Sequence, residues 1–178
     1  TVSLNQNGNQ YELSWNPLPD RVRVISEETR QELADISGAE GVSLYYSRSY
    51  TDGFYYLDTS FNGNVLGVDR NYFSVYGYQV RSGRGFTEKD YTEFRNVALI
   101  DSTAAKSLFS GVNPIGKEIE FGSSVYTVVG VVGPSEEFVP TINSMNDYYL
   151  YVNDGSGNIY FPDVLWPALY QFDEPQSV

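Results

Sequence analysis

The chain has 178 residues, of which 41% are hydrophobic, 16% aromatic and 19% charged, and it contains neither cysteine nor histidine. This composition is typical of a folded domain with a hydrophobic core, and it excludes disulfides, a thiol nucleophile, a Ser-His-Asp triad and a Cys/His zinc site. The net charge of −12, from 23 acidic and 11 basic residues, argues against nucleic acid as a partner.

The N-terminal part of the chain predicts a hairpin followed by a helix. Polar and apolar side chains alternate on both sides of Asn7-Gly8, which is a strong hairpin-turn sequence. Ser26 is expected to be a helix N-cap, because two glutamates follow it where the helix dipole favours acidic side chains. Leu33 and Ile36 are expected on the buried face of this helix.

The next part of the chain predicts mainly strands. Strands rich in Tyr and Phe are expected over 42–49 and 53–60, and the Asp-Gly pair at 52–53 is expected to form the hairpin turn between them. A further short strand is expected at 65–68. Residues 71–76 predict a short helical turn.

The second half of the chain predicts a strand, a helix and several more strands. Residues 96–100 form an apolar run typical of a buried strand, and Asp101 is expected to cap a helix that ends at Phe109. Further strands are expected at 117–121, 125–132, 147–152 and 158–162. Because strands dominate and the two helices do not alternate with them regularly, the sequence predicts an α+β fold with mostly antiparallel or mixed strands and a few short helices.

One stretch has the pattern of a phosphate-binding loop without its chemistry. Residues 111–117 match G-x-x-x-x-G-K, but residue 118 is Glu, whereas magnesium binding needs a Ser or Thr hydroxyl there. The predicted context is also reversed, because this loop follows a helix and precedes a strand. Residues 153–164 likewise lack the closing glutamate of an EF-hand. We therefore expect no bound nucleotide, metal or other cofactor.

The aromatic side chains leave a second interpretation open. Sixteen tyrosines and two tryptophans would suit a secreted carbohydrate-binding module, in which exposed rings stack on sugars. Aromatic side chains are also common in strands and in the cores of β-rich domains, so the composition does not decide between the two. A glycosidase would need a catalytic pair of carboxylates, and nothing in the sequence selects one among 23 acidic residues. We expect no enzymatic activity.

Five sequence blocks follow one another through the middle of the chain. They are Gly67–Phe73, Gly83–Thr87 with Asp90, Asn96–Phe109, Asn113–Lys117 and Tyr126–Val132. In this order and spacing they resemble the extracytoplasmic domain of MacB-type, FtsX-like ABC transporter permeases. The residues singled out as the structural motif are Gly83, Arg84, Phe86, Asp90, Asn113, Pro114, Gly116 and Gly130. We expect them to be architectural, with Arg84 and Asp90 paired across a turn.

The resemblance implies both a fold and a place in a larger protein. The domain would follow the first transmembrane helix of a permease, on the extracytoplasmic side of the cell membrane, and would pass ATP-driven movement outward. Its two expected lobes are a main membrane-proximal lobe from 1–85 plus 125–178 and a smaller inserted α/β lobe from 86–124. ATP would be hydrolysed by a separate cytoplasmic domain or subunit. The other implied partners are the membrane-embedded remainder, a second permease copy, a membrane-fusion-type adaptor or lipoprotein, and the exported substrate.

The last third of the chain holds most of the negative charge. Residues 118–178 contain nine acidic side chains and no Lys or Arg. Such a segment suits either a face for a cationic peptide or basic adaptor patch, or a surface that only keeps the domain soluble. The candidate partner surface consists of Glu136, Glu137, Asp147, Tyr148, Tyr149, Asp154 and Trp166.

Overall fold

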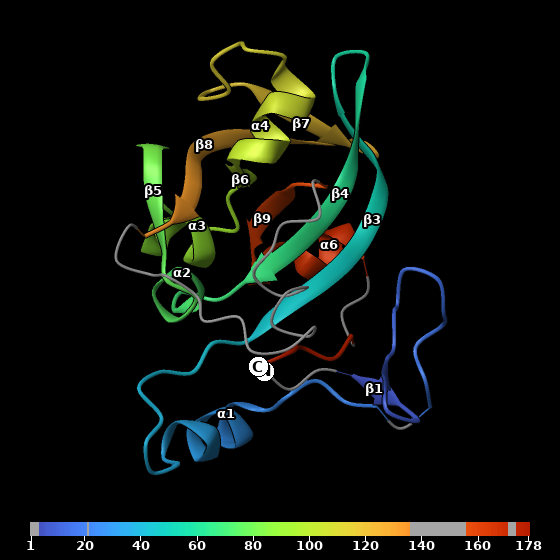
Figure 1. Cartoon of the computed structure of the whole chain (residues 1–178), viewed down its shortest axis with the longest axis vertical. Helices are drawn as coiled ribbons and strands as arrows, with labels where there is room; N and C mark the ends of the chain where they lie inside the picture. Colours follow the sequence, from blue (N-terminus) through green and yellow to red (C-terminus); the bar gives the residue numbers. More distant parts are fainter. Residues whose placement is uncertain (1–3, 21, 136–155, 171–173) are drawn as a thin grey trace.

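The computed structural model describes residues 4–20, 22–135, 156–170 and 174–178. Over these ranges the fold is α+β, with dominant strands and a few short helices, as the sequence predicts (Figure 1). No helix within these ranges is long and apolar enough to cross a membrane.

Seven of the described strands form one mixed sheet. In spatial order they are β5 (Tyr78–Gly83), β8 (Ser124–Pro134), β6 (Val97–Asp101), β9 (Asn158–Pro162), β4 (Thr59–Val68), β3 (Tyr45–Tyr56) and β7 (Glu118–Phe121). Because β7 pairs with β8 as well as with β3, six of these strands close into a ring, and β5 extends it along β8. The β6–β8 and β4–β9 pairs are parallel, and the other pairs of the sheet are antiparallel.

The longest strand pair differs from its prediction. β3 and β4 form a single hairpin whose turn lies at Leu57, and not at the Asp-Gly pair 52–53. Gly53 has a φ of +87° and lies in a register shift between the paired positions of Thr51 and Phe54. A β-bulge with a left-handed glycine uses the same residue types as a hairpin turn, which is why the sequence signal was misassigned.

The strand and helix in the middle of the chain follow their prediction. β6 is buried along its whole length and leads directly into α4 (Ser102–Phe109). Asp101 caps this helix, because its Oδ1 accepts a hydrogen bond from the Ala104 backbone N–H at 2.7 Å. Its Oδ2 accepts from Asn158 Nδ2 at 2.8 Å. The cap therefore fixes α4 both to its own strand and to β9.

The N-terminal hairpin forms at the predicted turn but is shorter than expected. β1 (Asn5–Gln6) pairs with β2 (Asn9–Gln10) in an antiparallel register. Asn7 and Gly8 between them have φ of +54° and +83°, the left-handed backbone that a tight two-residue turn requires. The alternating residues 11–15 continue as turns and irregular backbone, and do not extend the hairpin.

The first helix begins where predicted and packs less than predicted. α1 (Glu27–Ala34) starts at Ser26, whose Oγ accepts from the Thr29 backbone N–H at 3.1 Å. No residue of this helix is buried, Leu33 is only half-buried, and Ile36 is 57% exposed. The predicted buried face was therefore wrong, because neither hydrophobic cluster of the described residues includes a side chain of this helix.

Two hydrophobic clusters lie on opposite faces of the sheet, as the alternation of side chains along β6 and β9 requires. The larger cluster contains the fully buried rings of Phe54, Phe61, Phe109, Tyr126, Phe161 and Trp166. The remaining helical turns are α2 (Tyr72–Val75), α3 (Glu88–Thr92), η1 (Asp163–Leu165) and α6 (Trp166–Leu169). Many of the aromatic side chains thus lie in the core. This agrees with the interpretation that aromatic residues serve the strands and core of a β-rich domain, rather than a sugar-binding surface.

The expected division into two lobes is not confirmed. β6 and β7 both come from 86–124, the range assigned to an inserted lobe. In the structure β6 lies between β8 and β9, and β7 lies between β3 and β8. One sheet therefore runs through both expected lobes. The physical reason is that the apolar β6 is buried on both faces and needs a neighbouring strand along each edge.

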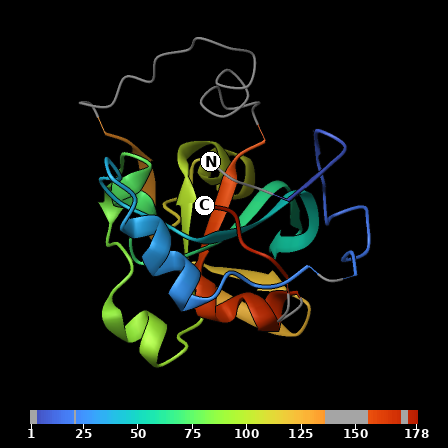
Figure 2. The same cartoon turned by 90° about the horizontal axis from the view of Figure 1, so that it is seen from below.

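The two ends of the long axis carry different parts of the chain. Figure 1 shows β1, α1 and the C-terminal residues at one end, and the β3–β4 turn with the loop after α4 at the opposite end. Viewed from the first of these ends, α1 lies across the rest of the fold, with the C-terminus nearby (Figure 2). The N-terminal segment that contains β1 and α1 and the C-terminal residues thus lie next to each other.

Candidate functional site

The motif at 83–90 holds a buried carboxylate at the start of α3. The Asp90 side chain is fully buried. Arg84 donates from Nη1 to Asp90 Oδ2 at 2.6 Å and from Nη2 to Oδ1 at 3.2 Å. Thr87 donates its backbone N–H at 2.7 Å and its hydroxyl at 2.8 Å, both to Oδ2. The structure therefore contains the expected pairing of Arg84 with Asp90, and the pair closes the turn from which α3 begins.

Hydrogen bonding outweighs burial at this carboxylate. Burial raises the pKa of Asp90, whereas the Arg84 guanidinium and the two donors of Thr87 lower it, and the resulting pKa lies below the usual value for an aspartate. The carboxylate is consequently ionised at neutral pH and is fully engaged by its donors. This arrangement suits a structural role, in which Asp90 fastens the turn to α3, and it leaves no proton for acid–base chemistry.

Two glycines of the motif allow the turn that contains Arg84 to lie close against the backbone of β8. A Cβ atom on Gly130 would lie 2.2 Å from the Arg84 carbonyl oxygen, and one on Gly83 would lie 2.3 Å from the Val129 carbonyl oxygen. The Arg84 N–H donates to that Val129 oxygen at 2.9 Å. Any larger residue at either position would push the turn away from β8 and lengthen this hydrogen bond.

Phe86 covers the apolar side of the motif. Its ring centroid lies 6.0 Å from that of Tyr91 and 6.1 Å from that of Phe73. Arg70 places its guanidinium over the Tyr91 ring at 4.5 Å and forms two hydrogen bonds of 2.7 Å with Glu88. These contacts join α2, α3 and the turn before α3, so this part of the motif is also structural.

The loop with the phosphate-binding pattern is a connection between α4 and β7, in the order that the sequence predicts. Within it, Asn113 Oδ1 accepts from the Ile115 backbone N–H at 3.1 Å across Pro114. Gly116 has a φ of +80°, and its N–H donates to the Val128 carbonyl at 2.8 Å. The Asn, Pro and Gly residues of this loop are therefore explained by its turn geometry.

The candidate partner surface of the last third is largely outside the described residues. This applies to Glu136, Glu137, Asp147, Tyr148, Tyr149 and Asp154. Trp166, its seventh member, is fully buried in the larger core cluster, so its assignment to a surface was wrong. Stacking explains the burial, because the Tyr46 ring lies parallel to the indole at 5.2 Å.

The C-terminal segment is held by an ion pair with β3. Arg48 Nη2 donates to Glu174 Oε1, and the Trp166 indole N–H donates to Glu174 Oε2 at 2.8 Å. Glu174 is buried, and the Arg48 guanidinium also lies over the Tyr170 ring at 5.0 Å. Glu174, one of the nine acidic residues in 118–178, is thus neutralised by an arginine from a distant part of the chain.

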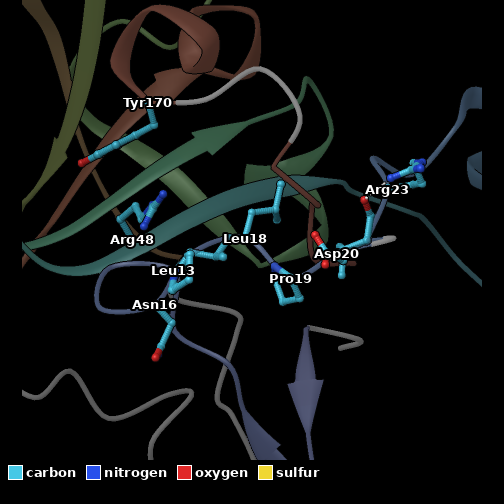
Figure 3. Close-up of a pocket in the computed structure, with 10 residues that line it drawn as sticks. Leu13, Asn16, Leu18, Pro19, Asp20, Arg23, Arg48 and Tyr170 are labelled. Carbon is cyan, nitrogen blue, oxygen red and sulfur yellow. Dashed lines mark hydrogen bonds between the residues drawn. The ribbon is translucent and has the colours of Figure 1, made fainter.

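A cavity of about 740 Å³ opens beside this ion pair. One wall is the N-terminal segment 13–23, and the other includes Arg48 and Tyr170 (Figure 3). The wall residues from the N-terminal segment are Leu13, Asn16, Pro17, Leu18, Pro19, Asp20, Val22 and Arg23. Apolar side chains, one acid and two arginines therefore face the same space.

Sequence reasoning did not identify Arg48 or Glu174. A signal for the first was present, because Arg48 is the only Lys or Arg between Arg30 and Arg70 and lies in an aromatic strand. No local pattern connects it with Glu174, since 126 residues separate the two. Their pairing follows from the tertiary structure alone.

Comparisons with known proteins agree on one family. The family model described as the MacB-like periplasmic core domain matches residues 1–174. The uncharacterized ABC transporter permease YvrN of Bacillus subtilis (strain 168) is 27% identical over 154 residues, which are 86% of this chain and 36% of YvrN. The macrolide export ATP-binding/permease protein MacB of Aggregatibacter actinomycetemcomitans is 28% identical over 121 residues, 68% of this chain and 17% of that protein. The chain thus spans well under two thirds of these relatives.

Solved structures have the same fold. The periplasmic region of MacB from Actinobacillus actinomycetemcomitans gives a TM-score of 0.59 at 25% identity, covering 83% of this chain and 59% of that one. The extracellular domain of the noncanonic ABC-type transporter YknZ from Gram-positive bacteria gives a TM-score of 0.60, covering 88% and 70%. At 22% identity, the second likeness concerns the fold alone.

Proposed function

Since this chain belongs to the family of MacB-like periplasmic core domains, we propose that it is the extracytoplasmic domain of an ABC transporter permease and carries ATP-driven movement away from the membrane. ATP would be hydrolysed by a separate cytoplasmic domain or subunit, and the domain itself would not be an enzyme. The membrane-embedded remainder of the permease and a second permease copy would be its permanent partners.

The observation that carries this proposal is that the C-terminal segment is attached to β3 and that the N-terminal segment is attached to the C-terminal one. Ser177 forms two backbone hydrogen bonds with Tyr45 at the start of β3, of 3.0 and 2.8 Å. Three residues before Ser177, Glu174 pairs with Arg48 on the same strand. The N-terminal segment joins them, because the Ile25 N–H donates to Gln176 Oε1 at 2.8 Å. A displacement of these segments would therefore move β3, and with it the sheet.

The opposite end of the sheet is suited to contact a partner. β3 continues to the hairpin turn, where Leu57 is 72% exposed and Tyr55 is 43% exposed. Exposed apolar side chains on a protruding hairpin are typical of protein contact sites. We assign this end to a membrane-fusion-type adaptor, a lipoprotein or the exported substrate.

A secreted carbohydrate-binding module is not favoured. That interpretation needs aromatic rings on the surface, whereas Tyr126, Tyr160 and Trp166 are buried in the core. The family match over residues 1–174 also leaves no separate region for such a module.

The proposal can be tested by following the hairpin turn in the full-length permease, reconstituted with its ATPase in lipid nanodiscs. A donor dye on Leu57→Cys and acceptor dyes on the lipid headgroups report the distance between the turn and the membrane. We expect ATP with Mg²⁺ to change the energy transfer reversibly, because the turn lies at the end of β3 that is remote from the attachments.

The matched control places the dye on Glu28→Cys, which lies on α1 at the other end of the long axis (Figure 1). We expect a smaller change at this position than at residue 57, since it lies closer to the attachment point. ATP hydrolysis at a normal rate with no change in transfer at either position would overturn the proposal.

A further inference from the structure

β5 has a neighbouring strand on one edge only, among the strands of the described ranges. On its paired edge the Gly77 carbonyl accepts from the Ser135 N–H at 2.7 Å, and Tyr78 lies opposite Pro134, which has no N–H. Hydrogen-bonded and non-hydrogen-bonded positions alternate along an antiparallel pair. The backbone N–H and C=O groups of Tyr78 and Val80 therefore face the open edge.

The open edge of β5 is exposed to solvent. Residues 79–83 are all exposed, and Figure 1 shows the strand at the outer margin of the sheet, with α2 and α3 beside it. Unpaired N–H and C=O groups on such an edge are a template for a further strand. A second copy of β5 is a poor candidate, because self-pairing would bring the exposed Arg81 of each copy close to the other. The edge therefore favours a strand from a different protein.

A cavity of about 520 Å³ lies beside β5, between this strand, α2 and the turn before α3. Phe73, Tyr78 and Phe86 in its wall pack against the smaller hydrophobic cluster but are only half-buried. The cover of this cluster is thus incomplete. The hydrophobic side chains of the wall are Phe73, Tyr78, Val80, Phe86, Tyr91 and Val132.

The charged side chains of the wall do not call for a charged occupant. Arg70 and Glu88 both line the cavity, and they are paired with each other at 2.7 Å. The Arg70 guanidinium also lies over the Tyr91 ring. Because these two charges satisfy one another, the space between the hydrophobic side chains suits an apolar group.

The region around the cavity is positive in an otherwise acidic chain. Residues 70–95 contain five of the 11 basic residues and only three of the 23 acidic ones. Each of these acids is paired with an arginine, in the pairs Arg70–Glu88, Arg84–Asp90 and Arg95–Glu93. Lys89 on α3 is exposed next to Glu88 at the cavity. A region of this sign attracts acidic residues of a partner.

We propose that β5 and the cavity beside it bind an extended segment of a partner protein. The segment adds a strand along the open edge of β5 and places a large apolar side chain in the cavity, and its acidic residues are attracted by the positive charge of residues 70–95. This contact is independent of the movement proposed above, because it uses only residues of the described domain.

The probe is the acetylated and amidated peptide EVTLTVE, added to the ¹⁵N-labelled 178-residue chain. Its polar and apolar residues alternate, so that one face of the added strand meets the cavity. We expect the amide NMR signals of Tyr78 and Val80 to shift until they saturate. Replacing the leucine by alanine should weaken binding about tenfold, because most of the apolar contact is lost. The matched peptide KVTLTVK should bind more weakly at low salt.

N-methylation of the peptide distinguishes strand pairing from other modes of binding. Successive N–H groups of a strand point to opposite edges, so methyl groups on the three apolar residues block one edge, and methyl groups on the two threonines block the other. We expect one of these two peptides to bind more than about tenfold more weakly than EVTLTVE, and the other to bind like it.

Variants of the chain locate the contact. Val80→Pro removes the N–H at the open edge and keeps an apolar side chain, and proline is tolerated at such edge positions. It should weaken EVTLTVE about tenfold, whereas Val80→Ala, which keeps the N–H, should weaken it less. Lys89→Gln should weaken the peptide about twofold at low salt only. Lys106→Gln on α4, which packs against the other cluster, should change nothing.

Three results would overturn the proposal. One is that both N-methylated peptides bind like EVTLTVE, or that both lose binding equally, and this comparison remains decisive if Val80→Pro does not fold. Another is that KVTLTVK binds as tightly as EVTLTVE at low salt. The third is a dimer of the chain that Val80→Pro dissociates, which would make a second copy the occupant of the edge.

Discussion

Arg48 on β3 and Glu174, 126 residues further along the chain, form an ion pair at the base of the sheet. Their side chains are 12% and 1% exposed, so both charges are largely removed from water. The Trp166 indole N–H occupies the second oxygen of the carboxylate. Because a buried charge is costly when its partner is removed, each member of this pair depends on the other.

We expect single substitutions of this pair to be strongly destabilising. Arg48→Gln or Glu174→Gln should lower the free energy of unfolding by about 3–5 kcal/mol, since each leaves one buried charge without its partner. The double variant should lose less than the sum of the two single losses. Urea denaturation of all three variants measures this coupling.

The control for this cycle is Arg95→Gln, because Arg95 pairs with Glu93 at side-chain exposures of 44% and 50%. An exposed pair contributes at most about 1 kcal/mol. If Arg48→Gln costs no more than Arg95→Gln, the ion pair does not hold the C-terminal segment.

Asp90→Asn tests the buried carboxylate that holds Arg84 and Thr87 at the start of α3. The carboxylate accepts from Arg84 and twice from Thr87, and an amide cannot accept all of these bonds. We expect a loss of about 2–3 kcal/mol in unfolding free energy at pH 7. Glu88→Gln, which affects an exposed pair with Arg70, should cost much less than Asp90→Asn.

The pH dependence of the Asp90 effect has a defined sign. The pKa of Asp90 in the folded chain lies below the usual 3.8, so its contribution to stability is present above that value. The contribution is lost as the pH falls through the folded pKa. The stability difference between the wild-type chain and Asp90→Asn should therefore narrow below about pH 4. A difference that stays constant from pH 7 to pH 2 would contradict this account.

Gly130→Ala tests the close contact between β8 and the turn before α3. A methyl group there would lie 2.2 Å from the Arg84 carbonyl oxygen and 2.8 Å from Leu99 Cδ2, so backbone has to move. We expect a loss of about 3 kcal/mol in unfolding free energy, the upper part of the range for overpacking. Gly133→Ala on the same strand meets only Arg81 side-chain atoms at 3.4 Å, and thermal unfolding should show a much smaller effect.

Local signals in the sequence were sufficient where one segment determines its own structure. Ser26 and Asp101 are helix caps because their side chains bond to a backbone N–H three residues ahead. The position of the loop at 111–117 between a helix and a strand also followed from local patterns. The mixed α+β fold followed from the predominance of strands over irregularly placed helices.

The sequence was insufficient where the outcome depends on contacts between distant segments. Gly53 supports a bulge because the opposite strand is long enough to continue past it, which the local Asp-Gly pattern does not reveal. Trp166 is buried because β3 presents Tyr46 against it. The closure of the sheet through β7 and β8 likewise depends on pairing that no single segment specifies, and for this reason the two-lobe expectation is not confirmed.

Asp163 at the end of β9 is a carboxylate in an unfavourable environment. Its Oδ1 is buried and has no hydrogen-bond partner in the described ranges. Burial and the nearby Asp69 carboxylate raise its pKa to about 6, against the smaller opposing effects of a hydrogen bond from the Val164 backbone N–H and of Arg70. Folding therefore favours the protonated form, so stability should fall as the pH rises from about 4 to about 6 and then stay reduced.

Asp163→Asn should remove this penalty, because the amide has nearly the same shape and no charge to desolvate. At pH 7 we expect the variant to gain about 1–2 kcal/mol in unfolding free energy, a value discounted for the partial exposure of the side chain. At pH 4 or below the two chains should be equally stable, since Asp163 is then protonated when folded. Asp58→Asn at the exposed hairpin turn is the control for replacing an aspartate by asparagine, and at pH 7 its stability should stay close to that of the wild-type chain. A variant that is less stable than the wild-type chain at pH 7 would mean that the charge of Asp163 is needed for the fold.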